Sequence, residues 1–273
     1  MKTQQFIIAA LITGTTFFAT TVMAQPSGIS GRATVKATVK MNGKLNVKKG
    51  ATAHFANTKV KNSKIGGNAD LNLYSETNGP VTIKKGARLA HGSFGMYNSQ
   101  IAGNVKANLR AKSKKITLEK GAKVFVGSVD MYNNSKINGN LDITATGETG
   151  NIKAGKNSLG VISSLRTNGS TIGGSGKFNL HSKTGNLTLG KGAHAYIASA
   201  DLTNSTVSGP MTMNSNVRLG NIKLGKNATF AAGSVVLNNS QIGGLNFTSN
   251  VQVSGPVTLA DGADVSLGSF QSI

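Results

Sequence analysis

Apolar and polar residues alternate along this chain in short segments that recur every 35 or 36 residues. The clearest segment has two apolar positions with one polar residue between them. The first apolar position is occupied by Leu45, Val81, Ile116, Ile152, Leu187, Ile222 and Val257, and the second by Val47, Ile83, Leu118, Ala154, Leu189, Leu224 and Leu259. A period of two predicts β-strands with one buried face, and no segment after residue 24 shows a convincing helical period of 3.6 residues.

Two columns of turn residues separate these predicted strands. The sequence Asn-Ser-x-Ile-x-Gly supplies the first column, with serines at Ser27, Ser63, Ser99, Ser135, Ser170, Ser205 and Ser240 and glycines at Gly31, Gly67, Gly103, Gly139, Gly174, Gly209 and Gly244. The second column contains only glycine and asparagine: Gly50, Gly86, Gly121, Asn157, Gly192, Asn227 and Gly262. These two residue types enter the left-handed backbone region at low cost, so we expect a tight turn there and a positive φ at Gly121.

A fixed period of this length indicates a repeat protein in which one structural unit stacks on the next. The expected fold is all-β, a parallel β-helix (β-solenoid) of about seven repeats. Asparagines before the serine column would hydrogen-bond along the axis if each repeat forms one coil, with neighbours about 4.8 Å apart. They are Asn62, Asn98, Asn134, Asn204 and Asn239. Two coils of about 18 residues per repeat is the alternative, because it would separate stacked lysines.

The N-terminal segment has the features of a secretory signal peptide: Lys2, an apolar run over residues 6–21 and small residues at positions 22 and 24. We therefore expect residues 1–24 to be a signal peptide and residues 25–273 to be a single β-solenoid domain. The expected location is extracellular or at the cell surface, with the periplasm left open. No later segment predicts a membrane span.

The chain is strongly basic, with 30 Lys and Arg against 9 Asp and Glu and a formal net charge of +21. One repeat position forms a predicted lysine stripe: Lys49, Lys85, Lys120, Lys156, Lys191 and Lys226, followed by Asp261 in the last repeat. Such a row would bind extracellular polyanions such as DNA, lipopolysaccharide or acidic polysaccharide. The alternative is that these lysines only keep exposed turns soluble. Few aromatics and no Trp argue against a stacking platform for single-stranded bases.

Polysaccharide lyases and hydrolases also use β-helix scaffolds, and they need clustered carboxylates. The acidic residues are interpreted as scattered over different repeat positions. His54 and His194 are assigned one repeat position, too many repeats apart to share a metal. We therefore predict no catalytic, cofactor or metal site, no small-molecule substrate and no enzymatic activity.

The Lys-Gly-Ala motif at 49–51, 85–87, 120–122 and 191–193, together with Asn-Ser-x-Ile-x-Gly, carries a resemblance. The chain resembles the β-solenoid repeat regions of secreted bacterial adhesins, haemagglutinin-like passengers and extracellular fibre proteins. The resemblance is architectural, covers almost all of the chain after residue 24, and transfers no site residues.

The two ends of the predicted solenoid lie near the same point of the repeat. Residues 27–31, which include Ile29, match residues 99–103, and residues 268–270, which end at Phe270, match residues 92–94. We expect a head-to-tail homopolymer that forms an extracellular fibre or biofilm-matrix component. The alternative is a monomeric surface adhesin or polyanion-binding module.

Overall fold

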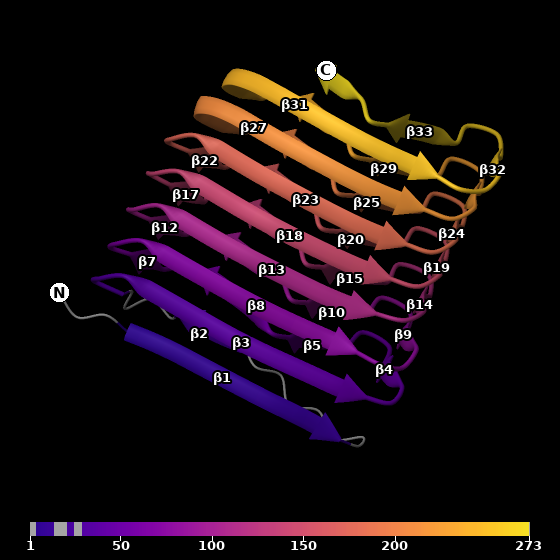
Figure 1. Ribbon diagram of the computed structural model, residues 1–273, viewed down its shortest axis with the longest axis horizontal. Helices are drawn as coiled ribbons and strands as arrows, with labels where there is room; N and C mark the ends of the chain where they lie inside the picture. Colours follow the sequence, from indigo (N-terminus) through magenta and orange to yellow (C-terminus); the bar gives the residue numbers. More distant parts are fainter. Residues whose placement is uncertain (1–3, 14–20, 25–28, 273) are drawn as a thin grey trace.

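The computed structural model describes residues 4–13, 21–24 and 29–272, and this part of the chain contains strands and no helix. The strands wind into a β-solenoid of seven stacked coils (Figure 1). Each coil contributes a strand to each of four parallel sheets, which we number I to IV in the order in which the chain visits them. The predicted all-β solenoid is confirmed.

Sheet I contains the long strands. They are β3 (Ala33–Asn42), β8 (Ala69–Thr77), β13 (Val105–Ser113), β18 (Leu141–Thr149), β23 (Gly176–Thr184), β27 (Thr206–Leu219) and β31 (Gln241–Val253). Two-residue strands precede four of them: β7 (Lys64–Ile65), β12 (Gln100–Ile101), β17 (Lys136–Ile137) and β22 (Thr171–Ile172). Sheet II contains the predicted apolar–polar–apolar segments: β4 (Leu45–Val47), β9 (Val81–Ile83), β14 (Ile116–Leu118), β19 (Ile152–Ala154), β24 (Leu187–Leu189), β28 (Ile222–Leu224) and β32 (Val257–Leu259).

Sheets III and IV complete each coil. Sheet III contains β5 (Thr52–Phe55), β10 (Arg88–His91), β15 (Lys123–Val126), β20 (Leu159–Ile162), β25 (His194–Ile197), β29 (Thr229–Ala232) and β33 (Asp264–Leu267). Sheet IV contains β6 (Asn57–Lys61), β11 (Phe94–Tyr97), β16 (Val129–Tyr132), β21 (Leu165–Asn168), β26 (Ala200–Thr203), β30 (Val235–Asn238) and β34 (Phe270–Ser272).

The strand register shows that each repeat forms one coil. Leu109 on β13 is the Cα partner of Leu73 on β8 and of Ala145 on β18, so that neighbouring strands lie 36 residues apart in sequence. Side chains of one column therefore stack on the inside of the solenoid, where Leu73 and Leu109 are fully buried. At a strand spacing of about 4.8 Å, seven coils extend for about 34 Å.

Left-handed residues occupy the predicted turn between sheets II and III. Gly121 has a φ of 67°, and Asn157 and Asn227 both have a φ of 54°. The asparagine ladder at the next predicted turn also forms in part, because Asn98 Nδ2 donates to Asn62 Oδ1 at 3.2 Å. Both turn predictions are confirmed.

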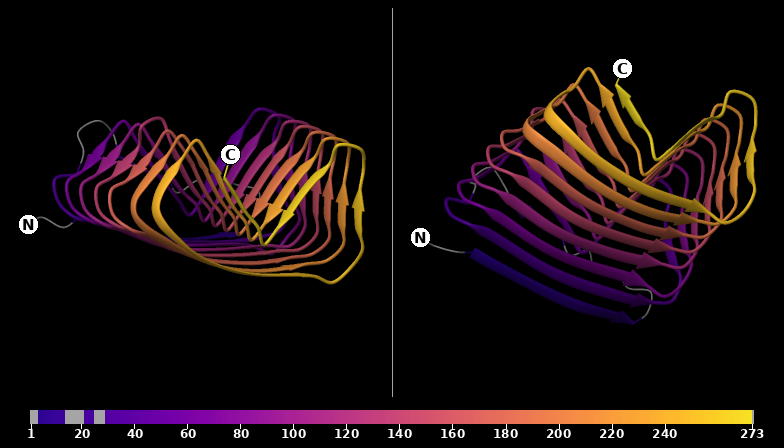
Figure 2. Two further views of the ribbon diagram at one scale, coloured as in Figure 1. Left: turned by 90° about the horizontal axis from the view of Figure 1, so that it is seen from above. Right: turned by 45° about the horizontal axis from the view of Figure 1, so that its top comes forward.

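The coil is folded inward between sheets III and IV, which meet at a sharp turn that packs against sheet I. At this turn Gly92 has a φ of 61°, and a Cβ there would lie 3.1 Å from the carbonyl oxygen of Arg110 on β13. The adjacent His91 side chain contacts Ser75 and Lys112 of sheet I. The outer faces of sheets III and IV consequently lie opposite each other across a V-shaped indentation of the ribbon (Figure 2), which we call the axial groove; within it a cavity is lined by residues of the first three coils.

Two strands within the predicted signal peptide lie on the edge of the first coil. β1 (Gln4–Thr13) pairs in parallel with β3, and β2 (Thr21–Ala24) pairs in parallel with β6. Removal of residues 1–24 stays a prediction, and cleavage after Ala24 would expose both edges. Ser27 of the serine column and the predicted first mature residue, Gln25, lie outside the described residues.

Candidate functional site

The predicted lysine stripe is a continuous row at the corner between sheets II and III. The backbone N–H of Gly50 donates to the Lys85 carbonyl at 3.1 Å, and Gly86 donates to Lys120 in the same way at 3.1 Å. The same bond repeats along the stack, and all six lysines are exposed. Glu119 partly offsets this charge, because its carboxylate accepts hydrogen bonds from Lys84 Nζ at 2.8 Å and from Lys85 N at 3.1 Å.

The serine and glycine columns bond the coils to one another. Ser99 Oγ donates to the Tyr97 carbonyl at 2.8 Å and accepts from the backbone N–H of Ser63, in the preceding coil, at 3.3 Å. Ser205 and Ser240 repeat this arrangement at 3.0 Å. A Cβ at Gly103 would collide with the side chain of Asn68 in the preceding coil. These columns therefore stabilise the stack rather than offer a binding surface.

The axial groove brings together side chains that no motif identifies. The sheet III wall carries one column of stacked residues: His54, Ala90, Phe125, Val161, Tyr196 and Ala231. The sheet IV wall carries the facing column: Lys59, Gly95, Asp130, Arg166, Asp201 and Val236. Three of the four tyrosines of the chain lie in this region, namely Tyr97, Tyr132 and Tyr196.

Two arginines connect the walls of the groove. Arg88 Nη2 donates to Tyr97 Oη at 3.0 Å and lies 3.7 Å from Asp130 Oδ2. Its guanidinium also lies 4.3 Å from the centre of the Phe125 ring. Arg166, on the opposite wall, lies 3.5 Å from Asp201 Oδ2 and 5.3 Å from the Tyr196 ring centre. The middle of the groove is thus filled by an ionic and aromatic network.

Burial changes the protonation of this network. Burial raises the pKa of Asp130 to about 6, although Arg166 and Arg88 act in the opposite direction. Burial likewise raises the pKa of Asp201 against the effect of Arg166. At the end of the groove near the first coil, burial lowers the pKa of His54, and the charges of Lys59 and Arg88 lower it further. Lys59 and Arg88 therefore favour the neutral form of His54 at this end of the groove.

The acidic residues are not scattered, and that interpretation is wrong. Asp130 and Asp201 occupy one column with Arg166 between them, because parallel strands place residues 35 or 36 apart side by side. On sheet I, Lys112 likewise stacks between Glu76 and Glu148. Lys112 Nζ lies 2.9 Å from Glu148 Oε2. Opposite charges in adjacent coils help to fix the register.

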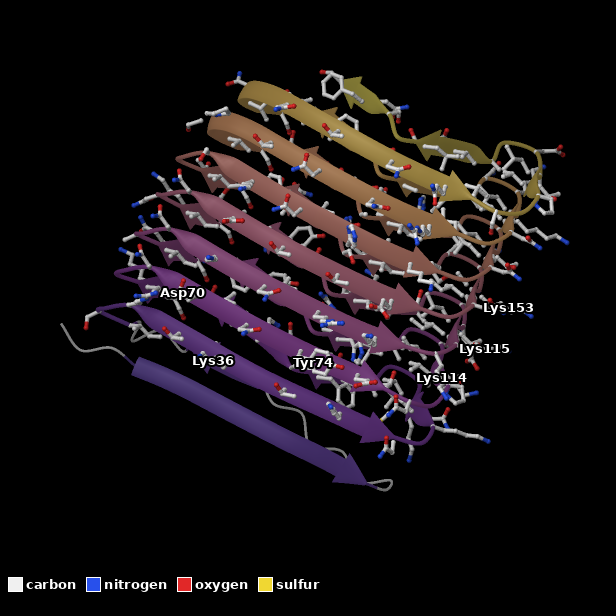
Figure 3. All side chains as sticks on the ribbon, viewed as in Figure 1. Lys36, Asp70, Tyr74, Lys114, Lys115 and Lys153 are labelled. Atoms are coloured by element: carbon white, nitrogen blue, oxygen red, sulfur yellow. The ribbon has the colours of Figure 1, made fainter. Side chains whose placement is uncertain are left out.

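The side-chain view shows how charge is distributed on the outside of the coil. Asp70 and Tyr74 lie on the outer face of sheet I, while Lys114, Lys115 and Lys153 project at the edge toward sheet II (Figure 3). In the column of Asp70, Lys106 separates it from Asp142. The exposed acidic side chains on the outer face of sheet I therefore have basic neighbours in the adjacent coils. The lysines of the lysine stripe, at the corner between sheets II and III, stack on one another instead.

Asp130 and Asp201 lie two strand spacings apart, about 10 Å along the axis. Arg166 lies between them, and each carboxylate is paired with an arginine. The cavity that Asp130 lines does not include Asp201.

The histidine assignment is also wrong. His54 is paired with Ala90, whereas His194 is paired with Leu159, which belongs to the column of Arg88. The reason is that His54 follows its turn at Gly50 by four residues, and His194 follows Gly192 by two. Within the described ranges, no group of three or more metal-ligating side chains could hold an ion.

A third left-handed column lies at the base of the groove and was not predicted. Its members have φ between 43° and 61°: Ala56, Gly92, Gly127, Ser163, Ala198, Gly233 and Gly268. A second serine ladder follows it, in which Ser199 Oγ accepts from the Ser234 backbone N–H at 3.4 Å. The recurrence of Gly-Ser at 92–93, 127–128, 233–234 and 268–269 is the signal that could have found this turn. The groove residues themselves differ from coil to coil, so periodicity gives no signal for them.

Comparison of the chain with protein-family models, with curated proteins and with solved structures gives no match. Among the residues described by the structure, no helix has the length and apolar character needed to span a membrane.

Proposed function

We propose that this chain is a secreted structural protein whose copies stack head to tail into an extracellular fibre or biofilm-matrix component. Opposite charge on the two terminal coils carries the proposal. Residues 29–61 contain no acidic residue and eight basic ones: Arg32, Lys36, Lys40, Lys44, Lys48, Lys49, Lys59 and Lys61. Residues 241–272 contain Asp261 and Asp264 and no Lys, Arg or His. Complementary charge of this kind favours association between the two faces.

The apolar columns of the seventh coil support the same contact. Val257 is 45% exposed and Leu259 is 49% exposed, whereas their neighbours in the sixth coil are at most 2% exposed. If a second copy continues the columns, its Leu45 and Val47 cover these two side chains. Asp261 then lies beside Lys49 of the second copy.

The edge of the first coil suits such a contact. β1 pairs with β3 along ten residues, with Phe6 opposite Val35. In a continued stack, Phe247 on β31 of a second copy would occupy the register position that Phe6 holds here. A contact between two different faces of the same protein does not close on itself, so it generates a filament.

Assembly of residues 25–273, followed by light scattering and electron microscopy, tests the proposal. Filaments are expected at low salt, and fewer at high salt because screening weakens the contact. Asp261→Lys should block assembly, as should Lys49→Asp. An equimolar mixture of the two variants should restore it, because each then offers the face that the other lacks.

The control variant, Thr82→Lys with Thr144→Lys, makes the same change in net charge as Asp261→Lys but away from the terminal coils. It should assemble like the unmodified chain. A wild-type chain that stays monomeric at every salt concentration, or a mixture that assembles no better than its components, would overturn head-to-tail assembly and leave the monomeric adhesin.

The exposed lysine stripe favours a second candidate function, polyanion binding. Replacing Lys85, Lys120, Lys156 and Lys191 together by Gln should weaken binding to DNA and reduce its salt dependence. Four lysines at dispersed positions, such as Lys36, Lys64, Lys106 and Lys177, form the control set. An equal loss in both would attribute binding to net charge alone.

A further inference from the structure

A cavity of about 140 Å³ opens into the axial groove, lined by side chains of the first three coils. Lys59 enters it from sheet IV, while His54 and Arg88 enter from sheet III. Asp130 also lines the cavity, and its negative charge is opposed by both Arg88 and Arg166. The cavity is thus more cationic toward the first coil than toward the centre of the groove.

Two cationic side chains meet at one tyrosine. Lys59 Nζ lies 5.1 Å from the centre of the Tyr97 ring, and Arg88 donates to Tyr97 Oη at 3.0 Å. Among the described residues, no ion pair includes Lys59. Arg88 Nε is buried without a hydrogen-bond partner in this part of the chain. Lys59 therefore has donors left for an anion, and Arg88 adds a second positive charge at the same cavity.

The protonation of the cavity residues agrees with this excess of positive charge. Burial lowers the pKa of Lys59, and the charges of Arg88 and Lys61 lower it further. The pKa of His54 is lowered by burial and by the charges of Lys59 and Arg88. An anion between Lys59 and Arg88 would offset the part of these shifts that comes from neighbouring positive charge.

We propose that this cavity binds a carboxylate group of an acidic polysaccharide whose chain lies along the groove. A guanidinium matches the geometry of a carboxylate, and a nearby ammonium adds a second charged donor. Tyr97, which lines the cavity, stacks on Tyr132 with ring centres 5.7 Å apart and an interplanar angle of 21°, so the tyrosine that contacts both cations is held in place.

Duplex DNA fits this position less well. The lining residues are recessed between two sheets, and the phosphates of a rigid duplex reach an exposed row such as the lysine stripe more readily. The proposal is independent of head-to-tail assembly, because the cavity lies within one copy of the chain. It is tested in residues 25–273 carrying Asp261→Lys, so that assembly does not contribute to the readout.

Titration with tetragalacturonate, followed by tyrosine fluorescence, tests the site. The chain has no Trp and four Tyr, so the groove tyrosines dominate its intrinsic emission. Lys59→Gln with Arg88→Gln should weaken binding by about tenfold or more, as expected for loss of two charged donors. The matched control, Lys85→Gln with Lys120→Gln, removes the same charge from the stripe and should change affinity by less than about twofold.

Two further measurements keep the result interpretable. Fully methyl-esterified tetragalacturonate should bind much more weakly, because it has no carboxylate. Arg88→Lys with Lys59 retained keeps the charge and should recover part of the affinity if the double variant is poorly folded. The proposal would be overturned if the groove and stripe variants weakened binding equally, or if the methyl ester bound as tightly as the free acid. It would also be overturned if DNA bound at the stripe displaced the oligosaccharide.

Discussion

Single glycines of the coil are constrained in two physically different ways. Gly121 has a φ of 67°, and nothing lies within 4 Å of the place where a Cβ would be. Gly103 has an ordinary φ, but a Cβ there would collide with Asn68. Backbone conformation therefore selects the first residue, and close packing between coils selects the second.

Replacement of Gly121 separates these effects. Gly121→Val should destabilise the fold by more than about 1 kcal/mol, because a β-branched residue is strained in the left-handed region. Gly121→Asn should be nearly neutral, since Asn157 adopts the same turn with a φ of 54°. Urea denaturation of both variants measures the difference. Equal stability of Gly121→Val and wild type would contradict the role of φ at this turn.

His91 predicts a dependence of stability on pH. It is fully buried between Ser75 Oγ, 2.7 Å from Nδ1, and the Lys112 carbonyl, 3.0 Å from Nε2. Burial lowers its pKa from 6.5 to about 4. His91 of the unfolded chain therefore becomes protonated below pH 6.5, whereas His91 of the folded chain stays neutral until about pH 4. The free energy of unfolding consequently falls as the pH is lowered from 6.5 to 4.

The comparison with His91→Gln isolates this contribution. Wild type should lose about 3 kcal/mol relative to the variant between pH 7 and pH 4. Asp130 has a raised pKa of about 6 and acts in the opposite sense, but it is present in both proteins and cancels. Denaturation at several pH values measures the difference. A difference that does not change with pH would show that the pKa of His91 is the same in the folded and unfolded chain.

At the scale of the elements, each sheet is a set of columns in which a residue meets its counterparts in the coils above and below. Apolar columns build the core, and serine and asparagine columns form hydrogen-bonded ladders. The charged columns of sheet I and of the groove alternate in sign, whereas the lysine stripe does not. The column Asp130–Arg166–Asp201 is the most buried of the charged ones, with side-chain exposures of 5%, 21% and 17%. Removal of its central cation should therefore have a large effect.

Arg166→Met is expected to cost about 2 kcal/mol, because it leaves two partly buried carboxylates with less compensation. Asp130→Asn and Asp201→Asn added to Arg166→Met should recover most of this loss. Arg218→Met, on the exposed face of sheet I, is the control and should change stability by less than about 0.5 kcal/mol. Thermal and urea denaturation provide the measurement, and a triple variant no more stable than Arg166→Met would contradict the ionic role.

At the scale of the whole molecule, the solenoid is built from nearest-neighbour contacts and is polar along its axis. Each coil contacts the coil before it and the coil after it, so stability is approximately a sum over coils and their interfaces. The basic first coil and the acidic seventh coil give the two faces different chemistry. Whole coils should therefore be removable, whereas fractions of a coil should not.

Deletion of residues 106–176 removes two whole coils and joins Val105 to Lys177, which keeps every column in register. The shortened protein should fold with one cooperative transition and a strand content reduced in proportion. Deletion of residues 106–123, about half a coil, shifts all later columns and should prevent folding. Circular dichroism and size-exclusion chromatography measure both outcomes, and two equally folded proteins would contradict one coil per repeat.

The sequence by itself determined the repeat, the strands and two of the turns. Each of these is a local constraint that recurs every 35 or 36 residues, so that Gly121 and Asn157 reveal the same turn in different coils. The lysine stripe was visible for the same reason. Repetition makes a weak local preference unambiguous, because a register that satisfies one coil must satisfy all of them.

Only the tertiary structure decided the shape of the coil and the chemistry of the groove. The inward fold depends on contacts such as His91 with Ser75, 16 residues apart, and its turn is occupied by Ala, Gly or Ser rather than by one signature residue. The groove side chains are set by neither period nor motif. Lys59, Arg88 and Tyr97 come from two walls of two coils, and they become neighbours only because sheets III and IV turn toward sheet I. Periodicity reports which residues stack along the axis, whereas the angles of the turns decide which columns face each other across it.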